Sequence, residues 1–286
     1  MASAGQRGGV NAMKLLTGST RLAGVTGWPV SHSRSPRIHN TWLQRYGIDG
    51  AYVPLPVRPE DFAATIPALA KAGFAGLNVT IPHKEAAFMV CDHVDESARL
   101  AGAVNTLVFT PQGIQGSNTD GYGFLANLRR HGVNPKAGPV LILGAGGAAR
   151  GIGAALREEG VDITFTNRTA ERAAALASAL PPARVLPWDA REAALGDYAL
   201  LINTTSLGMM RQPALTLNLD RATAGLSVAD IVFAPLETPL LAQARQRGLK
   251  PVEGLGMLLH QAVPGFATWF GLTPEVDDEL YRIAAA

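Results

Sequence analysis

Two polar segments of the sequence could bring a lysine and an aspartate together, and such a pair can exchange a proton with a substrate hydroxyl. In residues 78–84, NVTIPHK, a β-branched run ends at Pro82. Lys84 can therefore project from the carboxyl end of a strand, where open α/β sheets bind ligands. In residues 118–121, NTDG, Asp120 precedes an apolar helical stripe. Asp120 could instead cap that helix, and Lys84 alone is typical of a solvent-exposed lysine.

Neighbouring polar side chains offer further chemistry. Because side chains alternate along a strand, Asn78 and Thr80 lie on one face of the predicted strand. His83, His32 and His39 are alternative acid–base groups, since the unperturbed pKa of histidine suits proton transfer near neutral pH.

A glycine-rich turn follows a fully apolar run in the middle of the chain. Residues 140–143, VLIL, lead directly into residues 144–149, GAGGAA. Glycines let the backbone approach phosphates, and the following helix presents free N–H groups and the positive end of its dipole. Ala149 replaces the third glycine of the usual pattern, a change that the pattern tolerates. A plain strand–helix turn is the alternative, but the position after an apolar strand favours a dinucleotide site.

The next strand end indicates which dinucleotide binds. NAD sites carry an acidic residue about 20 residues after the glycines, for the ribose 2′-hydroxyl. This chain has Asn167, Arg168 and Thr169 there, followed by Arg172. Two guanidinium groups could pair with a 2′-phosphate, which favours NADP, although a solvated helix start would show the same residues.

Short apolar strands alternate with amphipathic helices through most of the chain, which predicts an α/β fold with largely parallel sheets. Beyond Asp120 the pattern forms a second unit. The predicted strands are residues 21–26, 51–55, 77–81, 106–109, 114–118, 140–143, 163–165, 200–202 and 228–232, and the last predicted helices are residues 257–269 and 274–284.

Several local signals give sharper expectations. Ser35 should cap a helix that has Pro36 in its first turn. Pro54 predicts that its strand lies at a sheet edge. Pro67 should break or restart the helix that carries Phe62 and Ile66, and Gly73 should end it.

Composition excludes several classes of protein. The chain has 286 residues, 47% of them hydrophobic and 17% charged, which suits about two domains with sizeable cores. The net charge of +2, without a basic run, gives no indication of nucleic-acid binding. No apolar run is long enough to span a bilayer, and the single cysteine, Cys91, cannot form an intramolecular disulfide. We expect a cytoplasmic protein, monomeric or homodimeric, with no metal site.

Together these segments resemble the shikimate dehydrogenase family. The matching blocks run in the family's order from about residue 21 to residue 269 and read HSRSP (32–36), NVTIPHKE (78–85), AGAVNT (101–106), GSNTDG (116–121), GAGGA (144–148), NRT (167–169), NTTS (203–206) and GLGML (254–258). Any one block could arise by chance, but their joint spacing is highly specific.

The resemblance implies the NADPH-dependent reduction of 3-dehydroshikimate to shikimate, a step towards chorismate and the aromatic amino acids. It implies that Lys84 is catalytic with Asp120 as its partner, and it ranks the three histidines below Lys84. It assigns the substrate carboxylate to Ser33 and Ser35, and the rest of the substrate to Asn78, Thr80, Asn105, Asp120, Phe233 and Gln261. The implied cofactor positions are Gly144, Ala145, Gly146, Gly147, Ala148, Asn167, Arg168, Thr169, Arg172, Thr204, Ser206, Ile231, Gly254, Met257 and Glu96.

The pattern of elements and the resemblance together divide the chain. Residues 1–119 form an N-terminal α/β substrate domain, in which residues 1–12 are a loose tail and Met13 could be the true start. Residues 120–253 form a Rossmann-like, doubly wound NADP-binding domain. No strand is predicted after the last helices, so residues 254–286 are expected to form C-terminal helices that return to the substrate domain.

One position departs from the family pattern. Relatives usually have a tyrosine where this chain has Phe233. The ring can keep its packing, but a hydroxyl hydrogen bond to substrate, worth roughly 0.5–1.5 kcal/mol, is lost. We therefore expect weaker substrate binding than in relatives with tyrosine.

Three alternatives remain open. A quinate/shikimate dehydrogenase would tend to carry threonine in place of Ser35 and an acidic residue in place of Asn167 or Arg168. An aminoshikimate dehydrogenase is not excluded by any residue. A non-catalytic dinucleotide sensor is disfavoured because Lys84 and Asp120 are both present.

Overall fold

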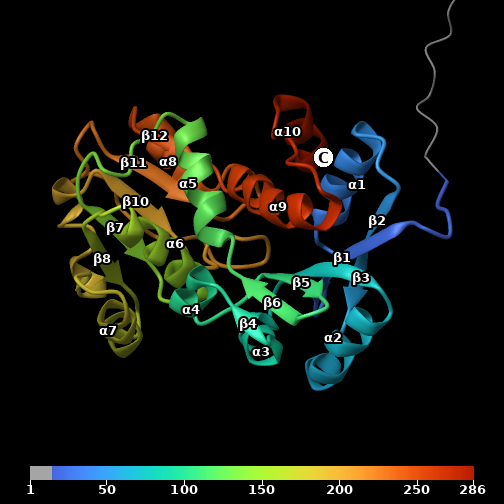
Figure 1. Cartoon of the computed structure of the whole chain (residues 1–286). Coiled ribbons are helices and arrows are strands. Elements are labelled where there is room, and N and C mark those ends of the chain that lie inside the picture. The colour runs from blue at the N-terminus through green and yellow to red at the C-terminus, as the bar shows by residue number, and fades with distance from the viewer. Residues whose placement is uncertain (1–14) are drawn as a thin grey trace, which may run out of the picture.

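The computed structural model describes residues 15–286 and forms two lobes, each built on a six-stranded sheet (Figure 1). The predicted tail, residues 1–12, and the alternative start at Met13 lie outside the described residues. The α/β fold class predicted from the alternation of strands and helices is confirmed.

The first sheet has the order β2-β1-β3-β5-β6-β4. Neighbours pair in parallel except β3 with β5 and β5 with β6, which form an antiparallel meander. Its strands are β1 (Arg21–Gly27), β2 (Gly50–Pro56), β3 (Phe74–Val79), β4 (His93–Val94), β5 (Thr106–Thr110) and β6 (Gly113–Ser117). The helices of this half are α1 (Ser35–Arg45), α2 (Phe62–Lys71), α3 (Lys84–Val90) and α4 (Glu96–Ala101).

The second sheet is entirely parallel, with the order β12-β11-β10-β7-β8-β9. This doubly wound order places the glycine-rich turn after β7, at the centre of the sheet. The strands are β7 (Val140–Leu143), β8 (Ile163–Thr166), β9 (Arg184–Val185), β10 (Leu200–Asn203), β11 (Ser227–Asp230) and β12 (Lys250–Val252). The helices are α5 (Asp120–Arg130), α6 (Gly147–Glu158), α7 (Ala170–Ala179) and α8 (Pro239–Gln246).

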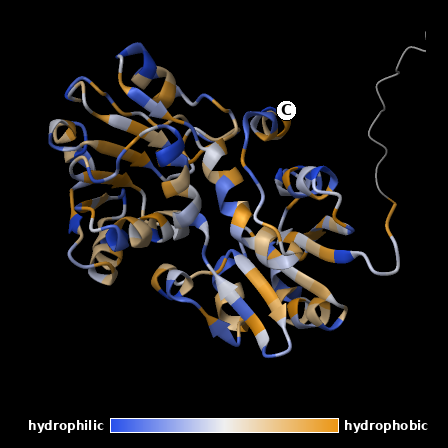
Figure 2. Cartoon of the chain, turned by 45° about the horizontal axis from the view of Figure 1, so that its top comes forward, coloured by the Kyte–Doolittle hydropathy of each residue, from blue (hydrophilic) through white to orange (hydrophobic). Residues whose placement is uncertain are grey.

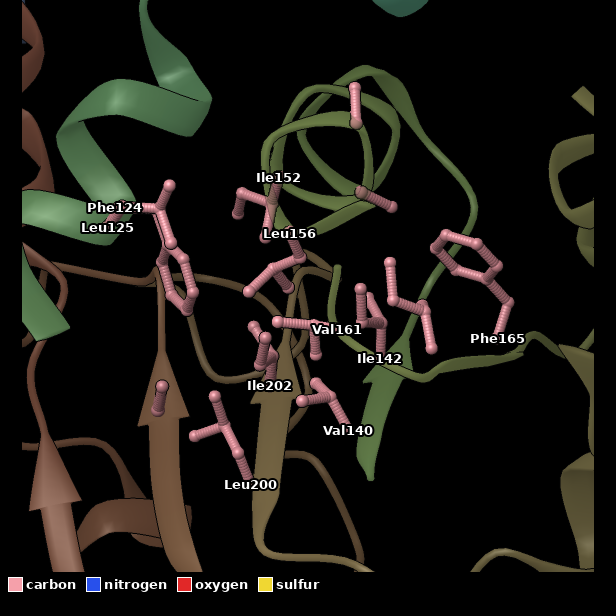
Figure 3. Close-up of a cluster of buried hydrophobic side chains, with 14 of the residues drawn as sticks. Phe124, Leu125, Val140, Ile142, Ile152, Leu156, Val161, Phe165, Leu200 and Ile202 are labelled. Carbon is pink, nitrogen blue, oxygen red and sulfur yellow. The ribbon is translucent and has the colours of Figure 1, made fainter. Parts of the chain in front are cut away.

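The second lobe has a core on each face of its sheet, because the central strands are buried on both sides. On one face, Phe124 from α5 and Ile152 and Leu156 from α6 pack with Ile142 and Ile202 (Figure 3). In Figure 2 the strands of both lobes are mostly orange or pale, whereas blue concentrates in the surrounding helices and loops.

The last two helices return to the first lobe, as predicted. α9 (Leu255–Phe270) lies between the lobes and α10 (Asp278–Ala285) lies beside α1 (Figure 1). Trp269 of α9 donates an indole N–H bond to the carbonyl of Leu107 in β5 (3.0 Å), and Trp42 of α1 donates one to the carbonyl of Glu275 (2.9 Å). A shared hydrophobic cluster of α1, β1, α9 and α10 completes this packing.

Several local predictions were right and others were wrong. The strand with Pro54 lies at the sheet edge, as predicted. Ser35 does not cap α1: the helix begins at Ser35 itself, Arg34 already has near-helical angles, and the Ser33 hydroxyl accepts a bond from the Ser35 N–H (3.3 Å). Pro67 does not break α2, because the burial of Phe62 and Ile66 on one face outweighs one lost backbone bond.

Some element boundaries were also misplaced, and two of them have a clear local cause. β3 ends at Val79 rather than at residue 81, because the chain then turns towards α3 and the His83 N–H bonds the carbonyl of Thr80 (3.0 Å). The final helix begins at Asp278 rather than at residue 274, since the Asp277 side chain accepts a bond from the Leu280 N–H (2.8 Å) and caps it.

Candidate active site

Lys84 and Asp120 meet at the junction of the two lobes. Lys84 is the first residue of α3, directly after the turn that ends β3, and Asp120 is the first residue of α5. The Lys84 Nζ and the Asp120 Oδ2 are 2.6 Å apart. The structure thus brings together two side chains that are 36 residues apart in sequence.

Asp120 does not cap α5, so the alternative interpretation of this residue is wrong. Thr119 occupies the cap position, and the Asp120 Oδ1 accepts a hydrogen bond from the Asn105 amide instead (2.8 Å). The Asp120 side chain is 3% exposed and that of Lys84 is 24% exposed. Asn105 therefore fixes the buried carboxylate of Asp120, whereas the Lys84 amine is partly exposed to the cavity.

Asn105 and Asn78 form the floor next to this pair. The Asn105 Oδ1 accepts bonds from the N–H (2.9 Å) and the hydroxyl (3.1 Å) of Thr119, so its amide nitrogen must face Asp120. The Asn78 Oδ1 accepts a bond from the buried Tyr52 hydroxyl (2.6 Å). These contacts fix the amide orientations before any ligand arrives.

A cavity of about 140 Å³ lies above this floor. It is lined by the predicted catalytic Lys84 and by all the residues predicted to bind substrate except Asp120, namely Ser33, Ser35, Asn78, Thr80, Asn105, Phe233 and Gln261. Asp120 lies behind Lys84 and Asn105. The cavity offers hydroxyl, amide and ammonium groups to a small polar ligand.

A larger cavity of about 940 Å³ adjoins the first. Its walls include Ala145, Gly146, Gly147, Ala148 and Arg172 from the predicted cofactor positions. Lys84 is the lining residue common to both cavities. A group bound in the larger cavity would therefore meet a ligand of the smaller one at the Lys84 amine.

The glycine-rich turn fits a dinucleotide phosphate. A Cβ added at Gly146 or Gly147 would meet no atom within 4 Å, so the backbone here is open to the cavity. Gly146 caps the 12-residue helix α6, whose free N–H groups lie at the cavity wall. Gly144 has a φ of +110°, a conformation that favours glycine at the strand end.

The other predicted cofactor positions fall mostly on one edge of the second sheet. Asn167, Thr204 and Ile231 directly follow β8, β10 and β11, at the carboxyl ends of the strands. Thr169 and Gly254 cap α7 and α9, and Ser206 lies in the loop after β10. Arg168 is exposed, and within residues 15–286 neither Arg168 nor Arg172 forms an ion pair.

Some predicted positions lie apart from the cavities. Glu96 forms an ion pair with Arg99 and lines neither cavity. Met257 is buried in the hydrophobic core of the second lobe. His83 and His39 are interior: His83 bonds the carbonyl of Val57 (2.8 Å), and burial lowers the pKa of His39 to about 3.

Two arginines in the cavity walls were missed from the sequence. Arg34 lines the smaller cavity and Arg150 lines the larger one. Both stand beside segments that the sequence singled out, since Arg34 separates Ser33 from Ser35 and Arg150 follows Ala149. Their position next to these motifs could have identified them as cavity residues from the sequence.

Residues 15–286 contain neither a metal-ligand cluster nor a membrane-spanning helix. No cluster of His, Cys, Asp and Glu in this range could hold a metal ion. None of its helices has the length and apolar character needed to cross a membrane.

Known proteins resemble this chain over nearly its whole length. Family models match at residues 25–107 (shikimate dehydrogenase substrate binding domain), 129–210 (shikimate / quinate 5-dehydrogenase) and 254–278 (shikimate 5′-dehydrogenase C-terminal domain). The shikimate dehydrogenase (NADP(+)) of Acidiphilium cryptum is 68% identical over 272 residues, covering 95% of this chain and 98% of the relative. That of Rhodospirillum rubrum is 54% identical over 275 residues, covering 93% and 97%. The crystal structure of the Thermus thermophilus shikimate 5-dehydrogenase in complex with NADP(H) and shikimate is 36% identical, with a TM-score of 0.86 over 93% of this chain and 98% of that chain.

Proposed function

This chain belongs to the shikimate dehydrogenase family, and on that premise we propose that it catalyses the reversible NADPH-dependent reduction of 3-dehydroshikimate to shikimate. The reaction is a step towards chorismate and the aromatic amino acids. One observation carries the proposal: the Lys84–Asp120 pair, 2.6 Å apart, stands in the wall between a small polar cavity and a larger one with an open glycine turn.

In this proposal the smaller cavity holds the substrate. The hydroxyls of Ser33 and Ser35 donate to its carboxylate, and Asn78, Thr80, Asn105 and Gln261 contact its ring hydroxyls. All six line the cavity. Phe233 closes the side that faces the second lobe.

The larger cavity holds the dinucleotide. When bound, NADPH supplies the hydride that reduces the ketone carbon. The chain positions it through the backbone of residues 144–148 and the start of α6. Arg168 and Arg172, which have no carboxylate partner among residues 15–286, can pair with the 2′-phosphate. Thr204, Ser206, Ile231 and Gly254 complete the edge at the strand ends that would hold the dinucleotide.

Lys84 moves the proton. Its ammonium group donates a proton to the ketone oxygen as negative charge develops there, and the reverse reaction returns that proton to the amine. Asp120 holds the Lys84 Nζ in place and contacts the substrate hydroxyls. The 24% exposure of the Lys84 side chain lets solvent restore the proton after each turnover.

The proposal includes the division of the chain made above, with boundaries after residues 119 and 253. It is supported by the two sheets, which lie on either side of residue 120, and by the packing of α9 and α10 on the first lobe. The proposal also includes a cytoplasmic location, a monomer or homodimer, and small-molecule ligands without nucleic acid.

Steady-state oxidation of shikimate with NADP, followed at the nicotinamide absorbance, tests the function. Quinate in place of shikimate and NAD in place of NADP are the comparisons. Because charge-assisted bonds to a 2′-phosphate contribute about 1.5–3 kcal/mol, kcat/KM should be about 10- to 100-fold higher with NADP than with NAD. NADPH binding without turnover would point to a non-catalytic sensor, and a preference for quinate would point to the sister activity.

A further inference from the structure

Arg34 places an uncompensated cation in the wall of the smaller cavity. The sequence motif assigns roles to its neighbours Ser33 and Ser35 and none to Arg34 itself. The arginine nevertheless lines the same cavity as both serines.

The Arg34 guanidinium is held against the ring of Phe233, with its Cζ 5.5 Å from the ring centroid. This cation–π contact joins the start of α1 in the first lobe to the loop after β11 in the second. The ring lies near the guanidinium carbon, and the N–H donors of the group point outward in its own plane. The group is thus positioned while its donors remain available.

One of these donors has no partner. Within residues 15–286, the Arg34 Nη1 is buried and makes no hydrogen bond, and Arg34 forms no ion pair. A buried guanidinium N–H without an acceptor is costly unless a ligand supplies one. We therefore expect a ligand to supply a hydrogen-bond acceptor to the Arg34 Nη1.

The charges of the cavity show which acceptor fits. Among the described residues that line it, the ionisable groups are His32, Arg34 and Lys84, and none is acidic. Lys84 is already paired with Asp120. The charge of Arg34 remains unpaired, and the planar guanidinium matches a carboxylate in shape and hydrogen bonding.

We propose that Arg34 binds the carboxylate of the substrate and is a specificity-determining residue for anionic ring acids. This inference rests on the proposed function, since the ligand is the shikimate of that reaction. Ser33 and Ser35 then supply neutral donors to the same carboxylate, and Arg34 supplies the charge. The Phe233 ring supports the arginine rather than touching the substrate through a hydroxyl.

The test compares shikimate with its uncharged methyl ester in the wild type and in Arg34→Met, Arg34→Gln and Arg34→Lys. With shikimate, the neutral variants should raise KM about 10- to 100-fold, while kcat and the KM for NADP stay within about threefold. With the ester, KM in these variants should hardly change. The wild-type preference for the acid, measured as the ratio of the two KM values, should therefore be lost. Arg34→Lys should recover most of the loss because it restores the charge.

Arg37→Met is the matched control, since it removes one exposed cation from the same helix outside the cavity and should leave both KM values unchanged. An equal rise in KM for acid and ester in both neutral variants, or no rise in either, would overturn the role of Arg34. The two neutral variants differ in side-chain polarity, so the comparison stands if one of them does not fold. Failure of the wild type to oxidise shikimate would instead overturn the proposed function.

Discussion

From the resemblance a tyrosine is expected where this chain has Phe233, and the surroundings of Phe233 indicate what a hydroxyl there would do. The ring lines the small cavity and lies in cation–π contact with Arg34. In Phe233→Tyr the aromatic ring is kept, and the new hydroxyl can bond the substrate. We predict that KM for shikimate falls about 2- to 10-fold, corresponding to one hydrogen bond of roughly 0.5–1.5 kcal/mol. Steady-state kinetics measure this, and an unchanged or higher KM would show that the hydroxyl makes no such contact.

Among single residues, the sequence motifs named several polar side chains that lie together in the structure. Lys84, Asp120 and Asn105 were all named from their motifs, and the structure joins them in one network. Arg34 was missed because its importance comes from Phe233, about 200 residues away, and no local pattern encodes that contact. Glu96 was placed at the cofactor on resemblance alone, whereas here it pairs with Arg99.

The turn after β7 depends on a glycine for a steric reason. Gly144 has a φ of +110°, and a Cβ there would lie 2.6 Å from the Oγ1 of Thr204, which bonds the carbonyl of Leu143. Gly144→Ala should therefore destabilise the fold by about 1–3 kcal/mol and raise KM for NADP. Chemical denaturation and cofactor titration measure the two effects.

Gly147→Ala is the informative comparison. A Cβ at Gly147 meets nothing within 4 Å, and the residue has no positive φ. Its stability should match the wild type while KM for NADP rises, because the added methyl group enters the phosphate cradle. Equal stability loss in both variants would argue against a steric role specific to Gly144.

Among the elements, strands and long helices could be predicted because their hydrophobic periods are strong. The ends of these elements were harder to predict where tertiary packing or a capping side chain determines them. Pro67 lies inside α2, since the buried face of that helix outweighs one missing hydrogen bond. α10 begins at Asp278 rather than at residue 274, because the Asp277 side chain caps it there and no hydrophobic period marks that position.

The stability of the whole molecule should respond to a buried carboxyl group in the second lobe. Burial raises the pKa of Asp230 to about 6, although bonds from Thr238, Val232 and Asn203 partly oppose the shift. Because this pKa lies above the ordinary value of 3.8, the group stabilises the fold fully below about pH 4, and that contribution is lost as pH rises through 6. The change amounts to about 3 kcal/mol.

Asp230→Asn should remove this dependence. The amide keeps an oxygen for Asn203 and Val232, and its nitrogen can donate to the Thr238 hydroxyl. Relative to the wild type, the variant should gain stability between about pH 4 and pH 7, as measured by urea unfolding at each pH. A difference between the two proteins that does not vary with pH would refute this account of Asp230.

The arrangement of the lobes could be predicted only in part. The return of the C-terminal helices followed from the absence of a strand after them, and the packing of α9 and α10 on α1 confirms it. The convergence of the two cavities at Lys84 could not be read from the sequence, because it depends on how α5 and α9 set one lobe against the other. In the proposed reaction, closure of the lobes would exclude water from this point.

The most direct test of the Lys84–Asp120 mechanism is the kcat of Lys84→Ala for shikimate oxidation, with Lys71→Ala as an exposed-lysine control on α2. Loss of the proton-transfer group should lower kcat by about 10²- to 10⁴-fold, with only a modest change in KM, because its interaction strengthens mainly in the transition state. The control should retain wild-type kcat. A Lys84→Ala enzyme with near-normal kcat would contradict the mechanism.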